Sequence, residues 1–220
     1  MEQTVLKSGT YIQISVRAEQ KLAARKLVEH SLTHHRVSNI WDKAQVLPAS
    51  TRMLRFTGTL GEIVFADSFH LPRPTRSFGA VDGQDWGQDF LIRSDLMDFA
   101  VDVKSMKRRA GNLAGDYVLN IPSSQLNKPG SKTTHYFCIS FHQSETAGTI
   151  ASLLGFIDKS ALQNGEIGRF YAAGTRRVRA DGTAFTFNED TYEILFSEIS
   201  PLTPTAYIRS LKGFRICALK

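Results

Sequence analysis

The chain has 220 residues, of which 42% are hydrophobic and 22% charged, a composition that is typical of globular domains and excludes a largely disordered chain. Its formal net charge of +6 and isoelectric point of about 9.4 favour a polyanionic partner, although a solvated basic surface has the same composition. No apolar run approaches the roughly 18 residues of a membrane span, and the N-terminal residues show no secretory signal, so we expect no membrane partner.

Cys138 and Cys217 are the only cysteines in the sequence, and each lies among apolar neighbours. Neither has the spacing of a metal ligand or of a CxxC motif, so we expect two buried free thiols in a reducing compartment and a cytoplasmic protein. The length fits a single domain over residues 1–220, with an N-terminal helical part at about 1–56 and a core at about 57–200.

Two helices are predicted in the first third of the chain. Residues 16–32 are rich in alanine, leucine, lysine, arginine and glutamate, and their apolar residues recur at helical spacing. Residues 58–69 form a second, more apolar pattern, in which Glu62 is the unusual member. The prolines and glycines of residues 71–87 then predict a break in regular structure.

Strands dominate from residue 89 onward. Residues 117–122, 134–142 and 153–158 are rich in β-branched, aliphatic and aromatic side chains. Residues 168–174, 176–187 and 192–199 continue the pattern, with Asp181 and Gly182 as a turn signal. Helices followed by strands predict a mixed α/β or α+β domain, and we expect an α/β fold with a central mixed β-sheet flanked by α-helices.

Residues 88–104 contain two segments in which apolar and polar side chains alternate. With a turn at residues 95–96 the two segments agree in phase, and Asp89 then lies opposite Asp102. The apolar face should fix this register, at about 1.5–3 kcal/mol for each large side chain that it buries. That face holds Phe90, Ile92, Phe99, Val101 and Val103. The other face holds Asp89, Leu91, Ala100, Asp102 and Lys104.

Two carboxylates would meet on the polar face of this hairpin. Opposed residues have Cβ atoms about 5 Å apart, so ionised Asp89 and Asp102 would repel each other, an inconsistency that is typical of functional sites. A divalent cation would turn the repulsion into chelation, and hard oxygen ligands favour Mg²⁺. Lys104 on the same face can orient a water or stabilise charge on phosphate oxygens. The alternative is a solvated sheet face with an Asp102–Lys104 ion pair.

At this point the sequence resembles the PD-(D/E)xK nuclease superfamily, whose members share the restriction-endonuclease-like fold. The resemblance rests on "GQDF" and "DVKS" and covers roughly residues 56–140. It maps the first acidic position of the family to Asp89, and the (D/E)xK motif to Asp102 and Lys104. Glu62 in "GTLGE" matches a helix glutamate that many members carry, and Gln125 in "IPSSQL" matches a glutamine of some branches more loosely.

The resemblance implies a Mg²⁺ site in which Mn²⁺ can substitute. Asp89 and Asp102 would bind the metal directly, and Glu62 would bind it directly or through water. The carbonyl of Val103 would add a ligand. Lys104 would position or activate the attacking water.

The first ligand has rivals within the sequence. Gln88 stands where the family often has proline, and the loop acids Asp82 and Asp85 are alternative candidates for the first acidic position. The register favours Asp89, because among these three acids only Asp89 pairs across from Asp102.

Basic residues flank the candidate site on both sides. Contacts with phosphates would give such residues a role in affinity and positioning, with little sequence information, whereas solvent-facing charge is the alternative. The predicted nucleic-acid contacts are Lys107, Arg108, Arg109, Arg73 and Arg76.

We therefore expect residues 57–200 to hold the catalytic core of a Mg²⁺-dependent DNA endonuclease, of the restriction or defence type. A repair or recombination nuclease of the same fold and a non-catalytic nucleic-acid-binding protein are the alternatives. The sequence lacks G-x-x-x-x-G-K-[ST], so we expect no nucleotide cofactor. A chain with one site would need a homodimer or two successive nicks to cut both strands.

Overall fold

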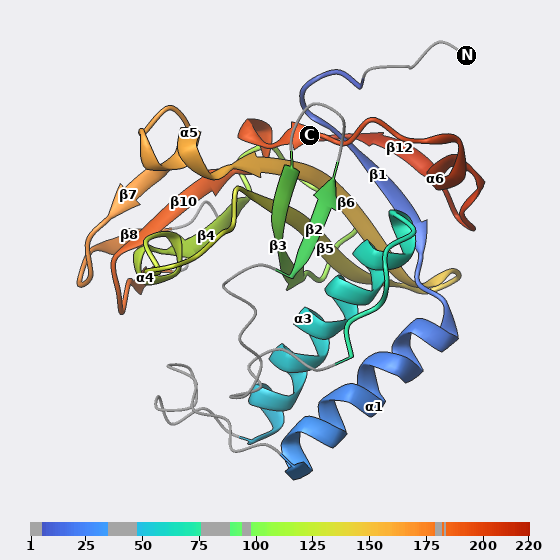
Figure 1. The fold of residues 1–220 in the computed structure, drawn as a ribbon. Coiled ribbons are helices and arrows are strands. Elements are labelled where there is room, and N and C mark those ends of the chain that lie inside the picture. The colour runs from blue at the N-terminus through green and yellow to red at the C-terminus, as the bar shows by residue number, and fades with distance from the viewer. Residues whose placement is uncertain (1–5, 35–47, 76–88, 94–97, 179–181, 183) are drawn as a thin grey trace.

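The computed structural model describes residues 6–34, 48–75, 89–93, 98–178, 182 and 184–220 (Figure 1). Within these residues a central sheet of seven strands contains one parallel pair, β3 with β5, and is otherwise antiparallel. The expectation of a central mixed sheet is therefore confirmed. In spatial order the strands are β12 (Arg215–Ala218), β1 (Thr10–Ser15), β6 (Gly148–Asp158), β5 (His135–Ser144), β3 (Asp98–Lys107) and β2 (Phe90–Arg93), with β11 (Ser200–Pro201) also paired to β6.

Two long helices, α1 (Ala18–His34) and α3 (Pro48–Ser68), lie side by side on one face of the central sheet (Figure 1). The larger hydrophobic core lies between them and the sheet, and Ala24, Ile63 and Phe65 of the helices are fully buried in it. Phe65 packs on Phe90 and Phe137 of the strands, with ring centroids 5.0 and 4.8 Å apart. This face matches the expected layer of helices on a sheet.

A second sheet covers the opposite face. It consists of β4 (Val118–Pro122), β10 (Thr191–Leu195) and β7 (Arg169–Tyr171), accompanied by the short helices α4 (Ser123–Leu126) and α5 (Lys159–Gln163) and by the 3₁₀ turn η1 (Phe196–Glu198). Leu126, Leu162 and Ile194 from these elements are fully buried in a second core against Tyr136 of the central sheet. The expected long helices therefore flank one face, while a sheet and short helices flank the other.

The helix predicted over residues 58–69 is the C-terminal part of α3, which begins at Pro48. Met53 and Leu54 in its first half are exposed, so the apolar residues of this half do not mark a single buried face of the helix. Gly61 lies against β3, because a Cβ on this glycine would overlap Ser105 Oγ and lie 2.9 Å from Ser105 Cβ. The glycine thus allows the helix backbone to approach the strand that carries the predicted motif.

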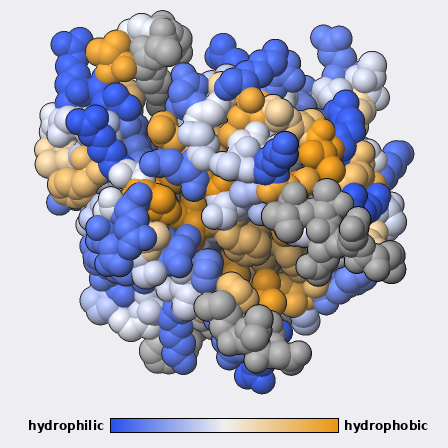
Figure 2. All heavy atoms as spheres, turned by 90° about the horizontal axis from the view of Figure 1, so that it is seen from above, coloured by the Kyte–Doolittle hydropathy of each residue, from blue (hydrophilic) through white to orange (hydrophobic). Residues whose placement is uncertain are grey.

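The remaining elements lie at the margins of the two sheets. The predicted hairpin at residues 176–187 is formed by β8 (Arg176–Val178) and β9 (Ala184–Thr186), and the expected turn residue Asp181 lies outside the described residues. The helix α6 (Ala206–Ser210) precedes β12. Viewed from above, hydrophilic side chains dominate the surface and hydrophobic ones gather in its middle (Figure 2).

Both cysteines are free thiols, as expected. Cys138 is fully buried, and this burial raises the pKa of its thiol to about 12, so that it behaves as an inert core residue. Cys217 is only partly buried. In the part of the chain that the structure describes, no helix is long and apolar enough to cross a membrane.

Candidate functional site

The hairpin of β2 and β3 has the register predicted from its alternation. Phe90 lies opposite Val101, and both side chains are buried in the larger core. The paired residues of β2 begin at Phe90, and Asp89 immediately precedes them. The backbone N–H of Asp89 donates to Val101 O, and Val101 is already the partner of Phe90, so the predicted position of Asp89 opposite Asp102 is not part of this ladder. The predicted turn at residues 95–96 lies outside the described residues, as do Gln88 and the rival acids at positions 82 and 85.

Asp89 is bound to the strand that carries the motif. Its backbone N–H donates to Val101 O at 2.8 Å, and its Oδ2 accepts from the backbone N–H of Val103 at 2.7 Å. In a strand the N–H and C=O of one residue point to the same side. The Val103 carbonyl, expected as a metal ligand, therefore points toward the edge at which Asp89 lies.

Lys104 joins the two motifs that the sequence predicted separately. Its Nζ donates to Asp102 Oδ2 at 2.8 Å and to Gln125 Oε1 at 3.0 Å. The side chains of Asp102 and Lys104 are only 20% and 18% exposed, so this pair is largely shielded from water. Gln125 comes from α4, which follows β4 in the crossover between the parallel strands β3 and β5. The loosely matched glutamine thus contacts the lysine of the motif.

The charges of the two aspartates are offset by donors of the chain itself. Asp102 faces the Lys104 ammonium, and Asp89 accepts from the Val103 amide. The ammonium and the amide N–H present positive charge to the two carboxylates and counter their mutual repulsion. The inconsistency expected from the sequence is therefore partly relieved without any metal.

Two further residues surround Asp102 and were not predicted. Tyr136 of β5 pairs with Asp102 across the parallel ladder and is 1% exposed. Burial, and then the negative charge of Asp102, raise the pKa of the Tyr136 phenol, which keeps it neutral. Lys159 at the start of α5 is 9% exposed. Burial lowers the pKa of Lys159, and the charge of Asp102 opposes that shift.

The position of Lys159 follows from the sheet and from a helix cap. Its backbone N–H donates to Thr134 O at 2.9 Å, which keeps the chain beside β5 as it leaves β6. Asp158 caps α5 by accepting from the N–H groups of Ser160 and Ala161. No local motif marks Tyr136 or Lys159, because both reach Asp102 through pairing between strands far apart in sequence.

Glu62 lies on α3, next to the glycine that touches β3, and is 7% exposed. This helix covers the apolar face of β3, whereas Asp102 and Lys104 project from the opposite face. Glu62 and Asp102 therefore belong to different faces of the sheet, and their carboxylates can approach each other only around its edge, on the side of Asp89. Among the described residues, no group of three or more histidine, cysteine, aspartate or glutamate side chains has an arrangement that could hold a metal ion.

The basic residues after the motif have different surroundings. Lys107 and Arg109 are exposed. Arg108 is tucked against the second sheet: its guanidinium lies 4.4 Å from the Tyr117 ring centroid and donates to Val118 O at 3.0 Å. Such a packed guanidinium supports the fold, and Lys107 and Arg109 remain the better candidates for phosphate contacts.

Arg73 belongs to a network that joins α3 to α1. Its Nε and Nη2 donate to Asp67 at 2.6 and 2.7 Å, and Arg17 and Gln20 donate to the same carboxylate at 2.7 and 2.8 Å. Burial would raise the pKa of Asp67, but the hydrogen bonds from Arg73, Gln20 and Arg17 outweigh it and lower the pKa. Arg76, predicted with Arg73, lies outside the described residues.

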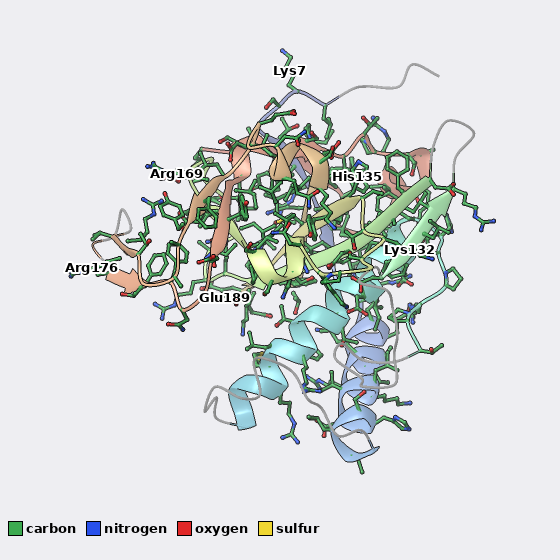
Figure 3. All side chains as sticks on the ribbon, turned by 60° about the vertical axis from the view of Figure 1, so that its left-hand side comes forward. Lys7, Lys132, His135, Arg169, Arg176 and Glu189 are labelled. Atoms are coloured by element: carbon green, nitrogen blue, oxygen red, sulfur yellow. The ribbon has the colours of Figure 1, made fainter. Side chains whose placement is uncertain are left out.

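Another basic group lies on the β8–β9 hairpin, away from α1 and α3. Arg176 is exposed at this end of the molecule (Figure 3). Arg177 donates to the buried Glu193 of β10 at 2.8 Å and lies over the Tyr171 ring, so it fastens the hairpin to the second sheet.

The chain was compared with models of protein families, with curated proteins and with solved structures, and none of them matches it. The interpretation of the Asp89, Asp102, Lys104 and Gln125 cluster therefore depends on its own geometry and on its short motifs.

Proposed function

We propose that the protein is a metal-dependent nuclease of the PD-(D/E)xK type, with a restriction-endonuclease-like fold, which hydrolyses phosphodiester bonds in DNA. The observation that carries this proposal is the double contact of Lys104 Nζ with Asp102 and Gln125. The carboxylate of Asp89, which immediately precedes β2, accepts from the Val103 amide of the strand that carries Asp102 and Lys104. A lysine held between an acid and an amide, beside a second acid, is suited to binding a water and a phosphate together.

The oxygen donors of the site fit Mg²⁺, with Mn²⁺ as a substitute. Asp89, Asp102 and the Val103 carbonyl would hold the ion. Glu62 forms no three-carboxylate cluster with the two aspartates among the described residues, so it would take part only through water. When bound, the cation would lower the pKa of a coordinated water and offset charge on the phosphate.

Lys104 would act directly on the reacting atoms. An ammonium has three N–H donors and no acceptor, and two of the three are engaged by Asp102 and Gln125. The third N–H can hold the attacking water or a non-bridging phosphate oxygen. Gln125 restricts the rotation of the lysine side chain and so keeps this donor aimed at the substrate.

The biological role that we favour is restriction or defence, because the sequence lacks a nucleotide-hydrolysis motif. A repair or recombination nuclease of the same fold comes second. In either role, cutting both strands would take two sites in a homodimer, or two nicks in succession.

Incubation of the full chain with supercoiled plasmid DNA and Mg²⁺ or Mn²⁺ tests the activity. We expect nicked or linear products that EDTA abolishes. Parallel reactions with labelled single-stranded DNA and RNA of one sequence identify the substrate. Intact nucleic acid in every metal-containing reaction would overturn the nuclease proposal.

A non-catalytic nucleic-acid-binding protein is the second candidate. The observation that favours it is the ion pair of Asp102 with Lys104, which already satisfies one carboxylate, together with the exposed Lys107 and Arg109 and the net charge of +6. Salt-sensitive binding to the same DNA without cleavage in Mg²⁺ or Mn²⁺ would support this function instead.

A further inference from the structure

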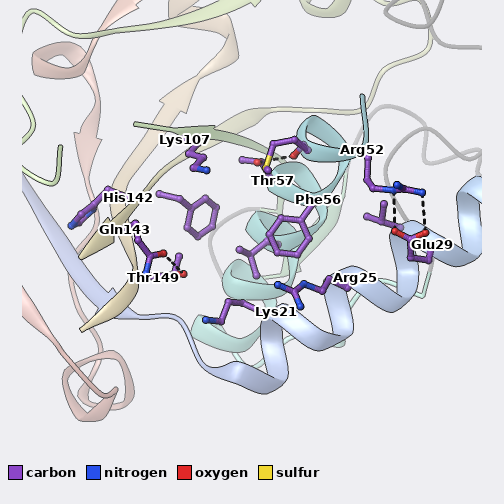
Figure 4. A pocket seen from close by; sticks show the side chains of 14 residues that line it. Lys21, Arg25, Glu29, Arg52, Phe56, Thr57, Lys107, His142, Gln143 and Thr149 are labelled. Carbon is purple, nitrogen blue, oxygen red and sulfur yellow. Dashed lines mark hydrogen bonds and ion pairs between the residues drawn. The ribbon is translucent and has the colours of Figure 1, made fainter. Parts of the chain in front are cut away.

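A pocket of about 510 Å³ lies between α1, α3 and the ends of β3, β5 and β6 (Figure 4). This volume is within the range of roughly 300–1,000 Å³ that is usual for small-molecule sites. Apolar side chains of both helices and of β5 line it, and two of them are aromatic. These apolar residues are Val28, Met53, Phe56, Leu60 and Phe141.

Cations surround this apolar lining. Lys21 and Arg25 lie one turn apart on α1, and Lys107 lies at the end of β3 on the other side of the pocket (Figure 4). Among the lining residues Glu29 is the single acid, and it is paired with Arg52, whose Nε lies 3.0 Å from Glu29 Oε1. Within the described residues, Lys21, Arg25 and Lys107 have no ion-pair partner. Like charges at this helical spacing are unfavourable by themselves, and an anion would relieve them.

The pocket is separate from the candidate nuclease site. Lys107 is five residues beyond Asp102 on β3, which places their Cα atoms about 16 Å apart at the usual rise of a strand. The two sites also use opposite faces of the strand, because odd-numbered residues of β3 face the helices and even-numbered ones face the second sheet. His142, although it lines the pocket, turns its ring toward Gly111 on that second face.

We propose that this pocket binds a short nucleotide with two or more phosphate charges, with a base against Phe56 and Phe141 and the phosphates at Lys21, Arg25 and Lys107. The aromatic lining suits a flat ring, and the cations on opposite rims suit a ligand with anionic groups on two sides. An alkyl carboxylate has neither the ring nor the second charge. The ligand would be bound and not hydrolysed, so the site needs no phosphate-binding motif of the nucleotide hydrolases. The proposal departs from the expectation of no nucleotide cofactor, which was drawn from the lack of such a motif.

Isothermal titration calorimetry of the full chain tests the proposal. The ligands are the dinucleotide pApA, AMP, inorganic phosphate and a single-stranded DNA of twelve nucleotides. Every titration is carried out without divalent metal. We expect one pApA per chain, bound more tightly than AMP, and phosphate bound most weakly. The double variant Lys21→Glu/Arg25→Glu should lose at least about tenfold in affinity for pApA.

Lys26→Glu, compared with the single variant Arg25→Glu that changes the net charge equally, is the control, because it alters an exposed charge on the same helix outside the pocket. The Lys26→Glu variant should retain its affinity for pApA, and thermal melts of all variants show whether the fold is retained. The absence of pApA binding at millimolar concentration would overturn the proposal, as would equal affinity for phosphate and pApA. Much tighter binding of the DNA strand that is lost in the double variant would assign the surface to a polynucleotide instead.

The nuclease proposal and the pocket proposal can be tested independently. An Asp102→Asn variant alters the candidate nuclease site and should still bind pApA with unchanged affinity. Loss of pApA binding in this variant would mean that the nucleotide occupies the nuclease site, and would contradict a separate pocket.

Discussion

At the scale of single residues, the candidate site is a balance of charges that the chain supplies itself. Asp102 is paired with Lys104, and Asp89 accepts from the Val103 amide. A metal that binds Asp102 Oδ2 would therefore compete with the Lys104 ammonium. Metal binding and the release of Lys104 from Asp102 would then be coupled.

The first prediction concerns metal binding. Mg²⁺ or Mn²⁺ should raise the melting temperature of the wild-type chain, because a ligand that binds only the folded state adds about 2.7 kcal/mol at a hundredfold excess over its Kd. Asp89→Asn and Asp102→Asn should each reduce the shift measured by differential scanning calorimetry. Equal shifts in the wild type and both variants would mean that the ion binds elsewhere.

The second prediction concerns Lys159. Burial lowers its pKa, so the folded state disfavours the charged form, and the unfolded chain binds more protons over the window below the ordinary lysine pKa. Lys159→Met should therefore raise the melting temperature at neutral pH. If the buried charge assists phosphate binding beside Asp102, the same variant should lose roughly tenfold or more in nuclease rate.

Lys7→Met serves as the control for Lys159→Met, because Lys7 is exposed and precedes β1, which is separated from β3 and Asp102 by β6 and β5. It should change neither the melting temperature nor the rate appreciably. A Lys159→Met protein that is less stable than wild type would contradict the assignment of a net burial cost to this lysine.

At the scale of elements, α3 holds the motif strand in place through a close contact at Gly61. Gly61→Ala should destabilise the protein by about 1–3 kcal/mol, because the new methyl group would overlap Ser105 and force the helix away from β3. Urea denaturation measures the change in the free energy of unfolding. Ser105→Gly in the same chain should recover part of the loss, and an equal loss in the single and double variants would place the cause elsewhere.

The network around Asp67 couples α3 to α1 and gives a pH-dependent prediction. The folded pKa of Asp67 is lowered, so its stabilisation is present above the unfolded pKa and is lost as the pH falls through the folded value. Asp67→Asn should cost about 1.5–3 kcal/mol at pH 7, and the difference from wild type should shrink well below pH 4. Chemical denaturation at pH 7 and at pH 3 measures the free energy of unfolding of the wild type and the variant.

Glu29→Gln is the control for Asp67→Asn, since it removes an exposed ion pair with Arg52. The side chains of Glu29 and Arg52 are 56% and 58% exposed. Its effect should stay below about 1 kcal/mol at either pH. An Asp67→Asn penalty that is the same at pH 7 and pH 3 would contradict a contribution from the ionised carboxylate.

Prediction from sequence succeeded for the hairpin because both of its strands carry the information locally. Their apolar residues alternate in matching phase, so one register alone buries Phe90 and Val101 together. The strand β1 was not predicted, since its short segment joins the sheet by pairing with β6, more than one hundred residues away. The N-terminal half of α3 was missed because Met53 and Leu54 are exposed there.

At the scale of the whole molecule, the site depends on contacts that no local pattern contains. The parallel pairing of β3 with β5 brings Tyr136 to Asp102, and the crossover between these strands delivers Gln125 to Lys104. The second sheet, which covers this face in place of a long helix, positions α4 and α5 at its border. The sequence could therefore predict the acids and the lysine of the hairpin, but not the neighbours that tertiary structure adds.

In the proposed nuclease, the net charge of +6 would act at this scale on recognition of DNA and not on the cleavage chemistry. Exposed cations lie at the end of β3, on the helix α1 and on the β8–β9 hairpin, and also elsewhere on the described surface, for example at Lys7 and Lys212. Binding to DNA would thus weaken with salt even in a variant that cannot cleave it. The contribution of a lysine to DNA binding is separated from its contribution to cleavage by comparing the cleavage rates of two variants that each lose one lysine charge.

The most direct test of the central claim compares Lys104→Met with Lys212→Met in the plasmid assay with Mg²⁺. Both variants remove one positive charge, but Lys212 is exposed near β12, at the sheet edge opposite β2. With DNA in excess, we predict that Lys104→Met slows cleavage by about 100-fold or more, while Lys212→Met cleaves at nearly the wild-type rate. Cleavage by Lys104→Met at the rate of the Lys212→Met control would contradict the assignment of this site.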